Sequence, residues 1–358
     1  MLTVWEINEW RAGRQTRIPG PFSELELRQA PGCPSTLIKK TIPNPAVGAF
    51  FSGWRTFQRG GGKLNLLELL HTSYVRSGGL GLQCKDPRDK IYGLLGMASD
   101  ASELGIDTDY TKTADEAFEQ VARYLIARGH LDILKWCSSR RVQPPTWVPN
   151  FNAKIAYTWS DDMGVPLFMA TGSRTQPTEP SNGSRPASIR LQGVRLDTIT
   201  AAGTIFVHDD EEPYDQAAAR QMFSELEVFL GHPSIYTETE RMDAIWRIPI
   251  CDREYHPTSG YFRRATADHS EKQFVALRTQ PLAGDVIAET MSYQLTMQYY
   301  TDGVRPIRSG KGYVGLGPGE TAPCDVIVLL YGATAPFILK PTGVPTSTIL
   351  LGRRTFTV

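Results

Sequence analysis

The 358-residue sequence lacks the short motifs by which several enzyme classes are recognised. Its six histidines are scattered and form neither a His-x-x-x-His nor a His-Glu-x-x-His pair, so no metal site is predicted. There is no Gly-x-Ser-x-Gly segment to carry a hydrolase serine. The glycines at 60–62 lack the Walker spacing, and those at 315–319 are followed by no predicted helix. We therefore predict neither a metal nor a cofactor.

An excess of charge is also missing, because 38 basic residues balance 38 acidic ones. This balance argues against binding by phosphate neutralisation and against a basic membrane-facing surface. The first twenty residues contain no apolar run long enough for a signal peptide or a spanning helix. Five cysteines without a Cys-x-x-Cys pair are typical of reduced thiols. We predict a cytoplasmic protein without a nucleic-acid partner or membrane insertion, and leave a homo-oligomer or a protein partner open.

The apolar spacing that is present predicts an α+β fold, with a helical block packed against a strand-rich, partly barrel-like C-terminal portion. Helices are expected over 64–77, 114–128, 214–230, 238–247 and 286–299, and strands over 188–200 and from 304 onward. We expect one integrated unit with five regions: an irregular aromatic segment (1–59), a helical block (60–143), a strand and loop region with a mobile insertion near 171–186 (144–205), a helical region (206–302) and a β-rich tail (303–358).

The stretch from Cys84 to Ala98 is the most informative part of the chain. We expect Asp86 to cap a helix and Pro87 to occupy its first position, where a missing N–H costs nothing. Tyr92 is expected to turn aside from the buried face. That face should be formed by three residues at helical spacing: Ile91, Leu94 and Leu95.

This stretch and several others resemble fungal heterokaryon-incompatibility (HET) domain proteins. The segments similar to the region behind the HET core are Leu66–Leu70, Cys84–Ala98, Thr108–Tyr110 and Pro145–Phe151. Those similar to the family's strand-rich tail are Lys311–Pro318, Asp325–Gly332 and Pro336–Pro341. In that family an α/β unit likened to Toll/interleukin-receptor domains precedes the central stretch. Its motifs are not found in the 83 residues before Cys84, so the resemblance implies a HET-like scaffold without that portion.

From the aromatic residues and the missing motifs we hypothesise a cofactor-independent cyclase of fungal secondary metabolism. It would hold an apolar terpenoid or polyketide for a pericyclic [4+2] cycloaddition of the Diels–Alder type, in which orientation removes much of the barrier. The predicted catalytic donors are Tyr92, Trp147 and Tyr313, and the predicted substrate-binding residues are Trp136, Met291, Tyr293 and Tyr331. Ordinary core packing is the alternative for these side chains.

Two alternatives for the whole protein remain open. The first is a heterokaryon-incompatibility or cell-death regulator that acts through protein contacts. The second is a TIR-like NAD hydrolase, which requires a front portion that this sequence does not show. A closed apolar pocket would distinguish the cyclase from a contact module, which should show an exposed apolar patch instead.

Overall fold

The computed structural model describes residues 64–75, 82–137, 145–153, 155, 167–176, 181–182, 188–207, 216–233, 235–256, 261–281, 285–341 and 348–353. The predicted aromatic segment 1–59 lies outside these residues, as does much of the predicted insertion near 171–186. The chain divides into two compact units: one holds residues 1–105 and 258–260, and the other holds the remainder. We describe each unit by itself. Within the described residues, no helix is long and apolar enough to cross a membrane.

The first unit is built from short helices. They are α5 (Leu66–Leu70), the π-helix η1 (His71–Val75), α6 (Asp89–Leu95) and α7 (Ala101–Leu104). A capping box between Asn65 and Glu68 closes the start of α5. The hydroxyl of Tyr74 donates a 2.9 Å hydrogen bond to the carbonyl of Lys90, which ties η1 to α6.

The stretch around α6 confirms part of its sequence-based prediction and corrects the rest. Ile91, Leu94 and Leu95 are buried as expected. The helix begins at Asp89, so the proline precedes it, and the Asp86 carboxylate accepts the N–H of Arg88 at 3.0 Å in the turn before the helix. Tyr92 is only 6% exposed, so the prediction that it turns aside is wrong. The reason is that Lys90 is buried as well, which means that α6 is enclosed on more than one side.

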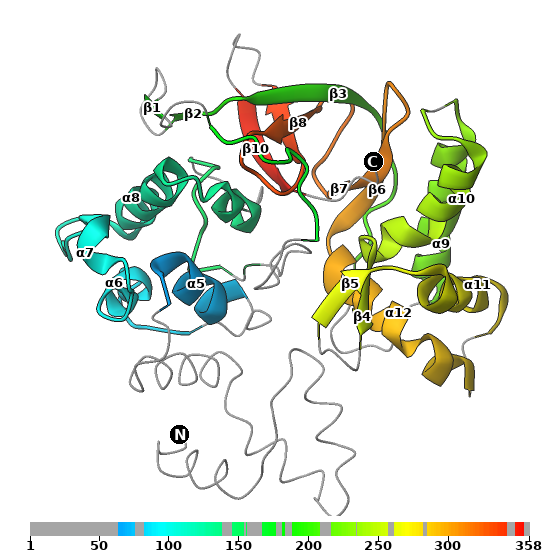
Figure 1. The fold of residues 1–358 in the computed structure, drawn as a ribbon, viewed down its shortest axis with the longest axis horizontal. Coiled ribbons are helices and arrows are strands. Elements are labelled where there is room, and N and C mark those ends of the chain that lie inside the picture. The colour runs from blue at the N-terminus through cyan, green and yellow to red at the C-terminus, as the bar shows by residue number, and fades with distance from the viewer. Residues whose placement is uncertain are drawn as a thin grey trace, which may run out of the picture. The chain divides into compact units, whose positions relative to one another are not determined.

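The second unit contains a six-stranded antiparallel sheet with the strand order β10-β9-β8-β3-β6-β7. Its strands are β3 (Gly193–Ala202), β6 (Val304–Ser309), β7 (Val314–Pro318), β8 (Val326–Leu330), β9 (Phe337–Pro341) and β10 (Thr348–Arg353). The outermost strands β7 and β10 also contact each other, so the sheet curls into an incomplete barrel (Figure 1). The predicted α+β class with a partly barrel-like C-terminal portion is confirmed.

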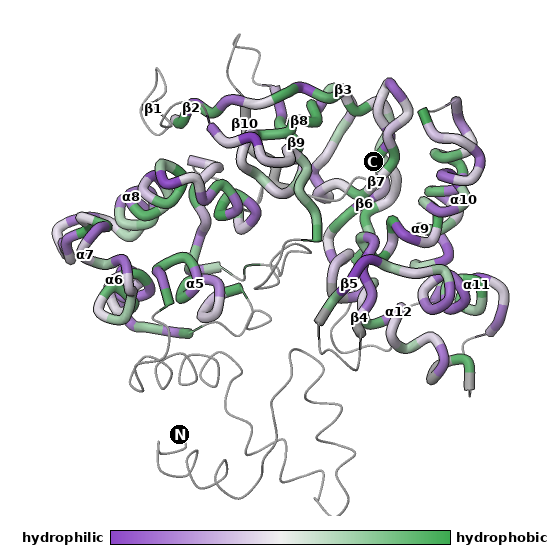
Figure 2. The backbone as a smooth tube through the Cα atoms, in the orientation of Figure 1, coloured by the Kyte–Doolittle hydropathy of each residue, from purple (hydrophilic) through white to green (hydrophobic). Residues whose placement is uncertain are grey.

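Helices and two small hairpins complete the second unit. The helices are α8 (Ala114–Ala127), η2 (Leu131–Trp136), α9 (Gln216–Gly231), α10 (Glu238–Arg247), η3 (Ile248–Ile250), η4 (Ala267–Glu271), α11 (Lys272–Thr279) and α12 (Asp285–Thr301). The hairpins pair β1 (Ser181–Asn182) with β2 (Ile189–Arg190), and β4 (Arg253–His256) with β5 (Tyr261–Arg264). Figure 2 shows hydrophobic and hydrophilic residues alternating along α9 and α10, as expected of helices with one buried face.

The sequence places Met291 and Leu295 in a row at steps of four that is expected to be buried in the helix predicted over 286–299, but neither is buried in α12. Met291 is 36% exposed. Among the described side chains of α12, the buried hydrophobic ones are instead Tyr293, Met297 and Tyr300, which recur at steps of four and three. An α-helix has 3.6 residues per turn, so a strict step of four drifts around the helix by about 40° each time. A row at steps of four therefore does not stay on the buried face of the helix.

The barrel has a small interior of its own. Its buried cluster is formed by one isoleucine from each of four strands: Ile199, Ile307, Ile327 and Ile338. A Cβ placed on Gly317 of β7 would lie 2.9 Å from the Thr321 Oγ1 atom and 3.0 Å from the Ile338 Cδ1 atom. The glycine repeat at 315–319 thus includes a position where an added methyl group would force buried side chains of the barrel to shift.

This packing makes a prediction for Gly317. Substituting Gly317→Ala should lower the free energy of unfolding by about 1–3 kcal/mol, because the added methyl group overfills the barrel interior. The matched control is Gly231→Ala at the end of α9, where nothing lies within 4 Å of the added Cβ. Urea unfolding should show no comparable loss in the control. A Gly317→Ala protein as stable as the wild type would contradict this account of the glycine repeat.

Candidate functional site

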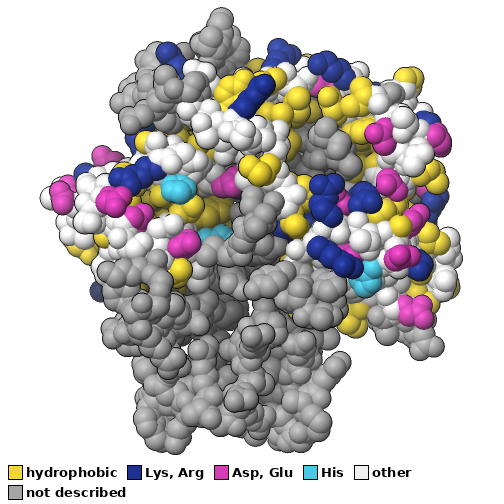
Figure 3. Space-filling view, viewed as in Figure 1, with side chains coloured by type: hydrophobic (Ala, Val, Ile, Leu, Met, Phe, Trp, Pro, Cys, Tyr) yellow, Lys and Arg dark blue, Asp and Glu magenta, His cyan; other side chains and the backbone are white. Residues whose placement is uncertain are grey.

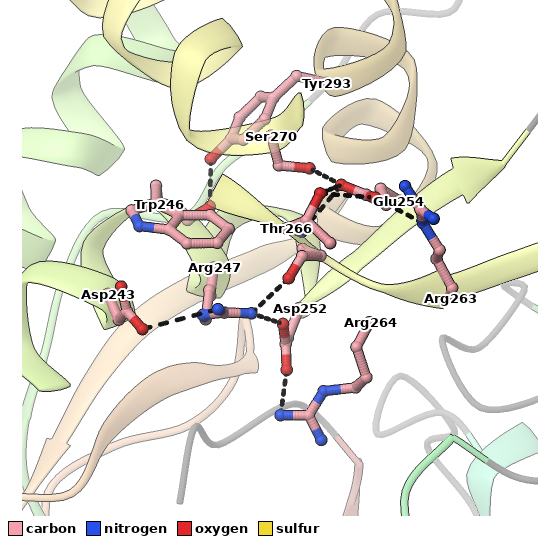
Figure 4. Close-up of polar contacts among 11 residues, drawn as sticks. Asp243, Trp246, Arg247, Asp252, Glu254, Arg263, Arg264, Thr266, Ser270 and Tyr293 are labelled. Atoms are coloured by element: carbon pink, nitrogen blue, oxygen red, sulfur yellow. Dashed lines mark hydrogen bonds and ion pairs between the residues drawn. The ribbon is translucent and has the colours of Figure 1, made fainter. Parts of the chain in front are cut away.

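Acidic side chains and partly exposed arginines gather beside the β4–β5 hairpin (Figure 4). We call this group the arginine–carboxylate network, and its members are Asp243, Arg247, Asp252, Glu254, Arg263 and Arg264. Charged side chains are rarely buried unless they are paired, because removing them from water is costly. A network of this size is therefore a feature to explain.

The network begins at an unusual turn. Helix α10 ends at Arg247, η3 follows, and then Cys251 and Asp252 adopt φ values of 54° and 52°. Non-glycine residues in this left-handed region cost about 1–3 kcal/mol each, so their surroundings must hold them. The N–H of Asp252 donates to the Arg247 carbonyl at 2.7 Å, and the N–H of Ala265 donates to the Asp252 carbonyl at 3.1 Å.

The Asp252 carboxylate is held from two sides. Its Oδ1 atom accepts a 2.7 Å hydrogen bond from Nη1 of Arg247, and its Oδ2 atom forms an ion pair with Nη2 of Arg264. Nη1 of Arg247 also donates to the Ala265 carbonyl at 2.6 Å, and its Nη2 lies 3.6 Å from Asp243. Arg247 thus joins the end of α10 to the strained turn and to the end of the hairpin.

The Glu254 carboxylate accepts hydrogen bonds from four donor groups. They are the N–H of Thr266 at 2.9 Å, the Thr266 hydroxyl at 3.0 Å, the Ser270 hydroxyl at 2.7 Å and Nε of Arg263 at 2.7 Å. Burial by itself would raise the pKa of Glu254, but these hydrogen bonds outweigh it and hold the pKa below its ordinary value. Glu254 is therefore ionised at neutral pH.

The arginines lie against aromatic rings. The guanidinium of Arg247 is 4.2 Å from the ring centre of Trp246, and that of Arg264 is 4.7 Å from that of Phe168. Arg253 is 1% exposed, donates to the Tyr300 hydroxyl at 3.2 Å and lies over the Phe262 ring. Such stacking limits the motion of the guanidinium groups without neutralising them.

Exposure separates the two signs of charge in the pairs formed by Arg263 and Arg264. The side chains of Arg263 and Arg264 are 49% and 55% exposed, whereas those of Glu254 and Asp252 are 2% and 4% exposed. In these two pairs the cation therefore faces the solvent and its counter-charge lies beneath. Figure 3 shows Lys and Arg side chains gathered on this face. Chemically, the arrangement suits recognition of a negatively charged group by pre-positioned guanidinium forks.

Four of the residues predicted to form a substrate site are buried. Tyr92 lies in α6 of the first unit. Trp136 packs edge-on against Phe151 at 6.4 Å, and Arg123 lies 4.7 Å from the Trp147 ring centre. Tyr293 donates its hydroxyl to the carbonyl of Trp246 at 2.7 Å, which places it beside the network (Figure 4).

The other three predicted residues lie nearer the surface. Tyr313 is partly buried and packs against the isoleucine cluster of the barrel. The ring centre of Tyr331 lies 5.7 Å from the guanidinium of Arg174, and Met291 is on the outer side of α12. Of all seven, Tyr293 is the one that borders the network. Within the described residues, no group of three or more His, Cys, Asp or Glu side chains is arranged to hold a metal ion.

Sequence reasoning missed the network, although a signal was present. Residues 248–254 read Ile-Pro-Ile-Cys-Asp-Arg-Glu, so three consecutive charges follow an apolar run directly. Across the hairpin, Glu254 pairs with Arg263 and Arg253 with Arg264. Of these two pairs, Glu254 and Arg263 carry opposite charges, and that match at facing positions of two candidate strands would have indicated this hairpin.

Comparison with known proteins finds a similar domain in the C-terminal part of the chain. Residues 259–355 match the model of the Het-6 β-barrel domain, a span that includes β5, α11, α12 and strands β6 to β10. Strand β3 lies outside that match, although it occupies the centre of the sheet. No solved structure matches the chain.

A curated relative is similar to a longer part of the chain. The chain is 29% identical over 311 residues to heterokaryon incompatibility protein 6, OR allele, of Neurospora crassa. The alignment covers 71% of this chain and 45% of the relative, so the chain matches less than half the length of that protein. Together, the domain and the relative confirm the resemblance to heterokaryon-incompatibility proteins.

Proposed function

We propose that this protein acts in heterokaryon incompatibility as a regulator that works through protein contacts. The observation that carries the proposal is the outward-facing pair Arg263 and Arg264 above the buried carboxylates of Glu254 and Asp252. Part of this arrangement lies in the segment that matches the Het-6 β-barrel domain. The similarity to heterokaryon incompatibility protein 6 supports the biological setting.

The surroundings of the side chains predicted for a cyclase site favour a packing role over a catalytic one. A donor that stabilises a transition state must point at the position where charge develops. The Tyr293 hydroxyl instead donates to the Trp246 carbonyl, and both residues are 2% exposed or less. Tyr92 and Trp147 are 6% and 7% exposed. The comparisons likewise favour the incompatibility hypothesis over a Diels–Alder cyclase.

Inducible expression of the chain in a filamentous fungus tests the proposal. We expect a rise in the fraction of hyphal compartments that take up a vital dye, with an unchanged profile of lipophilic metabolites. A Gly317→Ala protein at matched level controls for toxicity caused by misfolded chains. A new cyclised metabolite without cell death would overturn the proposal and restore the cyclase hypothesis.

A further inference from the structure

We infer that the outer edge of β5 binds an extended acidic segment of a partner protein, with two adjacent carboxylates paired to Arg263 and Arg264. The inference rests on the proposed function and names the partner's chemistry. Strand β5 pairs with β4 in a two-stranded sheet, and no other described strand pairs with it. An unpaired strand edge is a template for another strand.

The register of the hairpin shows which main-chain groups face outward. The N–H of Ala265 donates to the Asp252 carbonyl, so the pair formed by these residues is a hydrogen-bonded one. Such pairs alternate with non-hydrogen-bonded pairs along an antiparallel ladder. Arg264, which lies opposite Arg253, is therefore in a non-hydrogen-bonded pair, and its N–H and C=O point away from β4. A partner strand would form its main-chain hydrogen bonds there.

The side chains on this edge select for negative charge. Neighbouring residues of a strand point to opposite faces, so Arg263 and Arg264 lie on the two sides of the hairpin. One small anion cannot bridge both sides. An added strand also alternates its side chains, so two consecutive Asp or Glu residues would each meet one arginine.

The bonds already made leave both guanidinium forks with free donors. Arg263 uses Nε for Glu254, and Arg264 uses Nη2 for Asp252. An arginine carries five N–H groups, which suit paired hydrogen bonds to carboxylates. Charged edges normally discourage strand pairing, so a neutral or basic strand would be rejected and an acidic one accepted.

The test measures fluorescence anisotropy of the full chain with a labelled peptide, Gly-Ser-Asp-Asp-Glu-Glu-Gly-Ser. Three comparisons isolate the parts of the inference: the Asn-Asn-Gln-Gln peptide removes charge, an N-methylated acidic peptide removes main-chain donors, and the R263Q/R264Q protein removes the forks. Each change should weaken binding tenfold or more. The R263K/R264K protein keeps both charges, and we expect it to lose an intermediate amount of binding affinity. It replaces R263Q/R264Q in the test if that variant fails to fold.

The matched control is R195Q/R278Q. Arg195 is exposed and donates to Thr198, and Arg278 is 48% exposed and pairs with Glu227, but neither lies on the hairpin. We expect its affinity to stay within twofold of the wild type. The inference would be overturned if the N-methylated peptide bound as tightly as the acidic peptide, or if R195Q/R278Q lost as much affinity as R263Q/R264Q. Binding of a phosphopeptide or an anionic vesicle in place of the acidic peptide would also overturn it. The proposed function would survive such a result if cell death persisted, so the two can fail separately.

Discussion

Replacing Glu254 by alanine is expected to lower the free energy of unfolding by about 3–5 kcal/mol at pH 7. The substitution removes a buried carboxylate that accepts hydrogen bonds from Thr266, Ser270 and Arg263. The Ser270 hydroxyl is then left buried without this acceptor. Urea unfolding followed by tryptophan fluorescence measures the loss. Glu227→Ala is the control, because Glu227 is 37% exposed in its pair with Arg278 and should change stability by less than about 1 kcal/mol.

The stabilisation that Glu254 provides should also depend on pH and decrease at low pH. The folded protein lowers the pKa of Glu254, so the stabilisation is complete above the unfolded pKa of about 4.3 and is lost as pH falls through the lower folded value. The stability difference between the wild type and Glu254→Gln should therefore shrink as the pH drops below about 4. A difference that stays constant from pH 7 to pH 3 would show that the carboxylate charge does not contribute.

Replacing Asp132 by alanine is expected to cost about 3–5 kcal/mol, because it removes the counter-charge of a buried ammonium group. The Lys135 side chain is 0% exposed, and its Nζ atom lies 2.7 Å from the Asp132 carboxylate. Both groups also contact the Thr334 hydroxyl, which joins η2 to the turn between β8 and β9. Loss of the acid leaves the charge inside the protein with one strong partner fewer.

The double substitution D132A/K135M sharpens this prediction. It removes both charges, so it should be more stable than D132A alone by about 2 kcal/mol. K135M alone should cost less than D132A, because the Asp132 side chain is 34% exposed and water can solvate it. Thermal unfolding of the four proteins gives the coupling. A double variant less stable than D132A would mean that the Lys135 side chain stabilises the fold mainly by packing.

Local signals explain which elements the sequence could predict. Helix α10 spans Glu238–Arg247 as expected, and its start is marked by a capping box between Thr237 and Glu240. The same Thr-x-x-Glu pattern starts α8 at Thr113. Both signals act within four residues, so a single sequence contains all the information that they need. The strand predicted over 188–200 was also found, as β2 and β3.

Long-range pairing explains what the sequence could not predict. Strand β3 lies between β8 and β6, and its Ile199 pairs with Ser309, more than a hundred residues away. The residue pattern of β3 does not indicate which strands it pairs with. The network depends on backbone geometry instead, because Arg247, Asp252 and Arg264 meet around the left-handed turn at Cys251 and Asp252.

The candidate site shows the same limit. The cyclase hypothesis selected aromatic residues by type, and sequence cannot tell a tyrosine that lines a pocket from one that fills a core. Tyr293 illustrates this, because its hydroxyl is used to hold α12 to the end of α10. The exposed arginines were overlooked because a neutral chain gives no sign that its cations and anions differ in burial.

The most direct test compares cell death caused by three proteins at matched expression levels: wild type, R263Q/R264Q and the control R195Q/R278Q. Equal melting temperatures should first be verified for all three. If the protein acts through contacts at the β4–β5 hairpin, death should fall to the background with R263Q/R264Q and remain at the wild-type level with the control. Full activity of a folded R263Q/R264Q protein would contradict the claim that this surface carries the function.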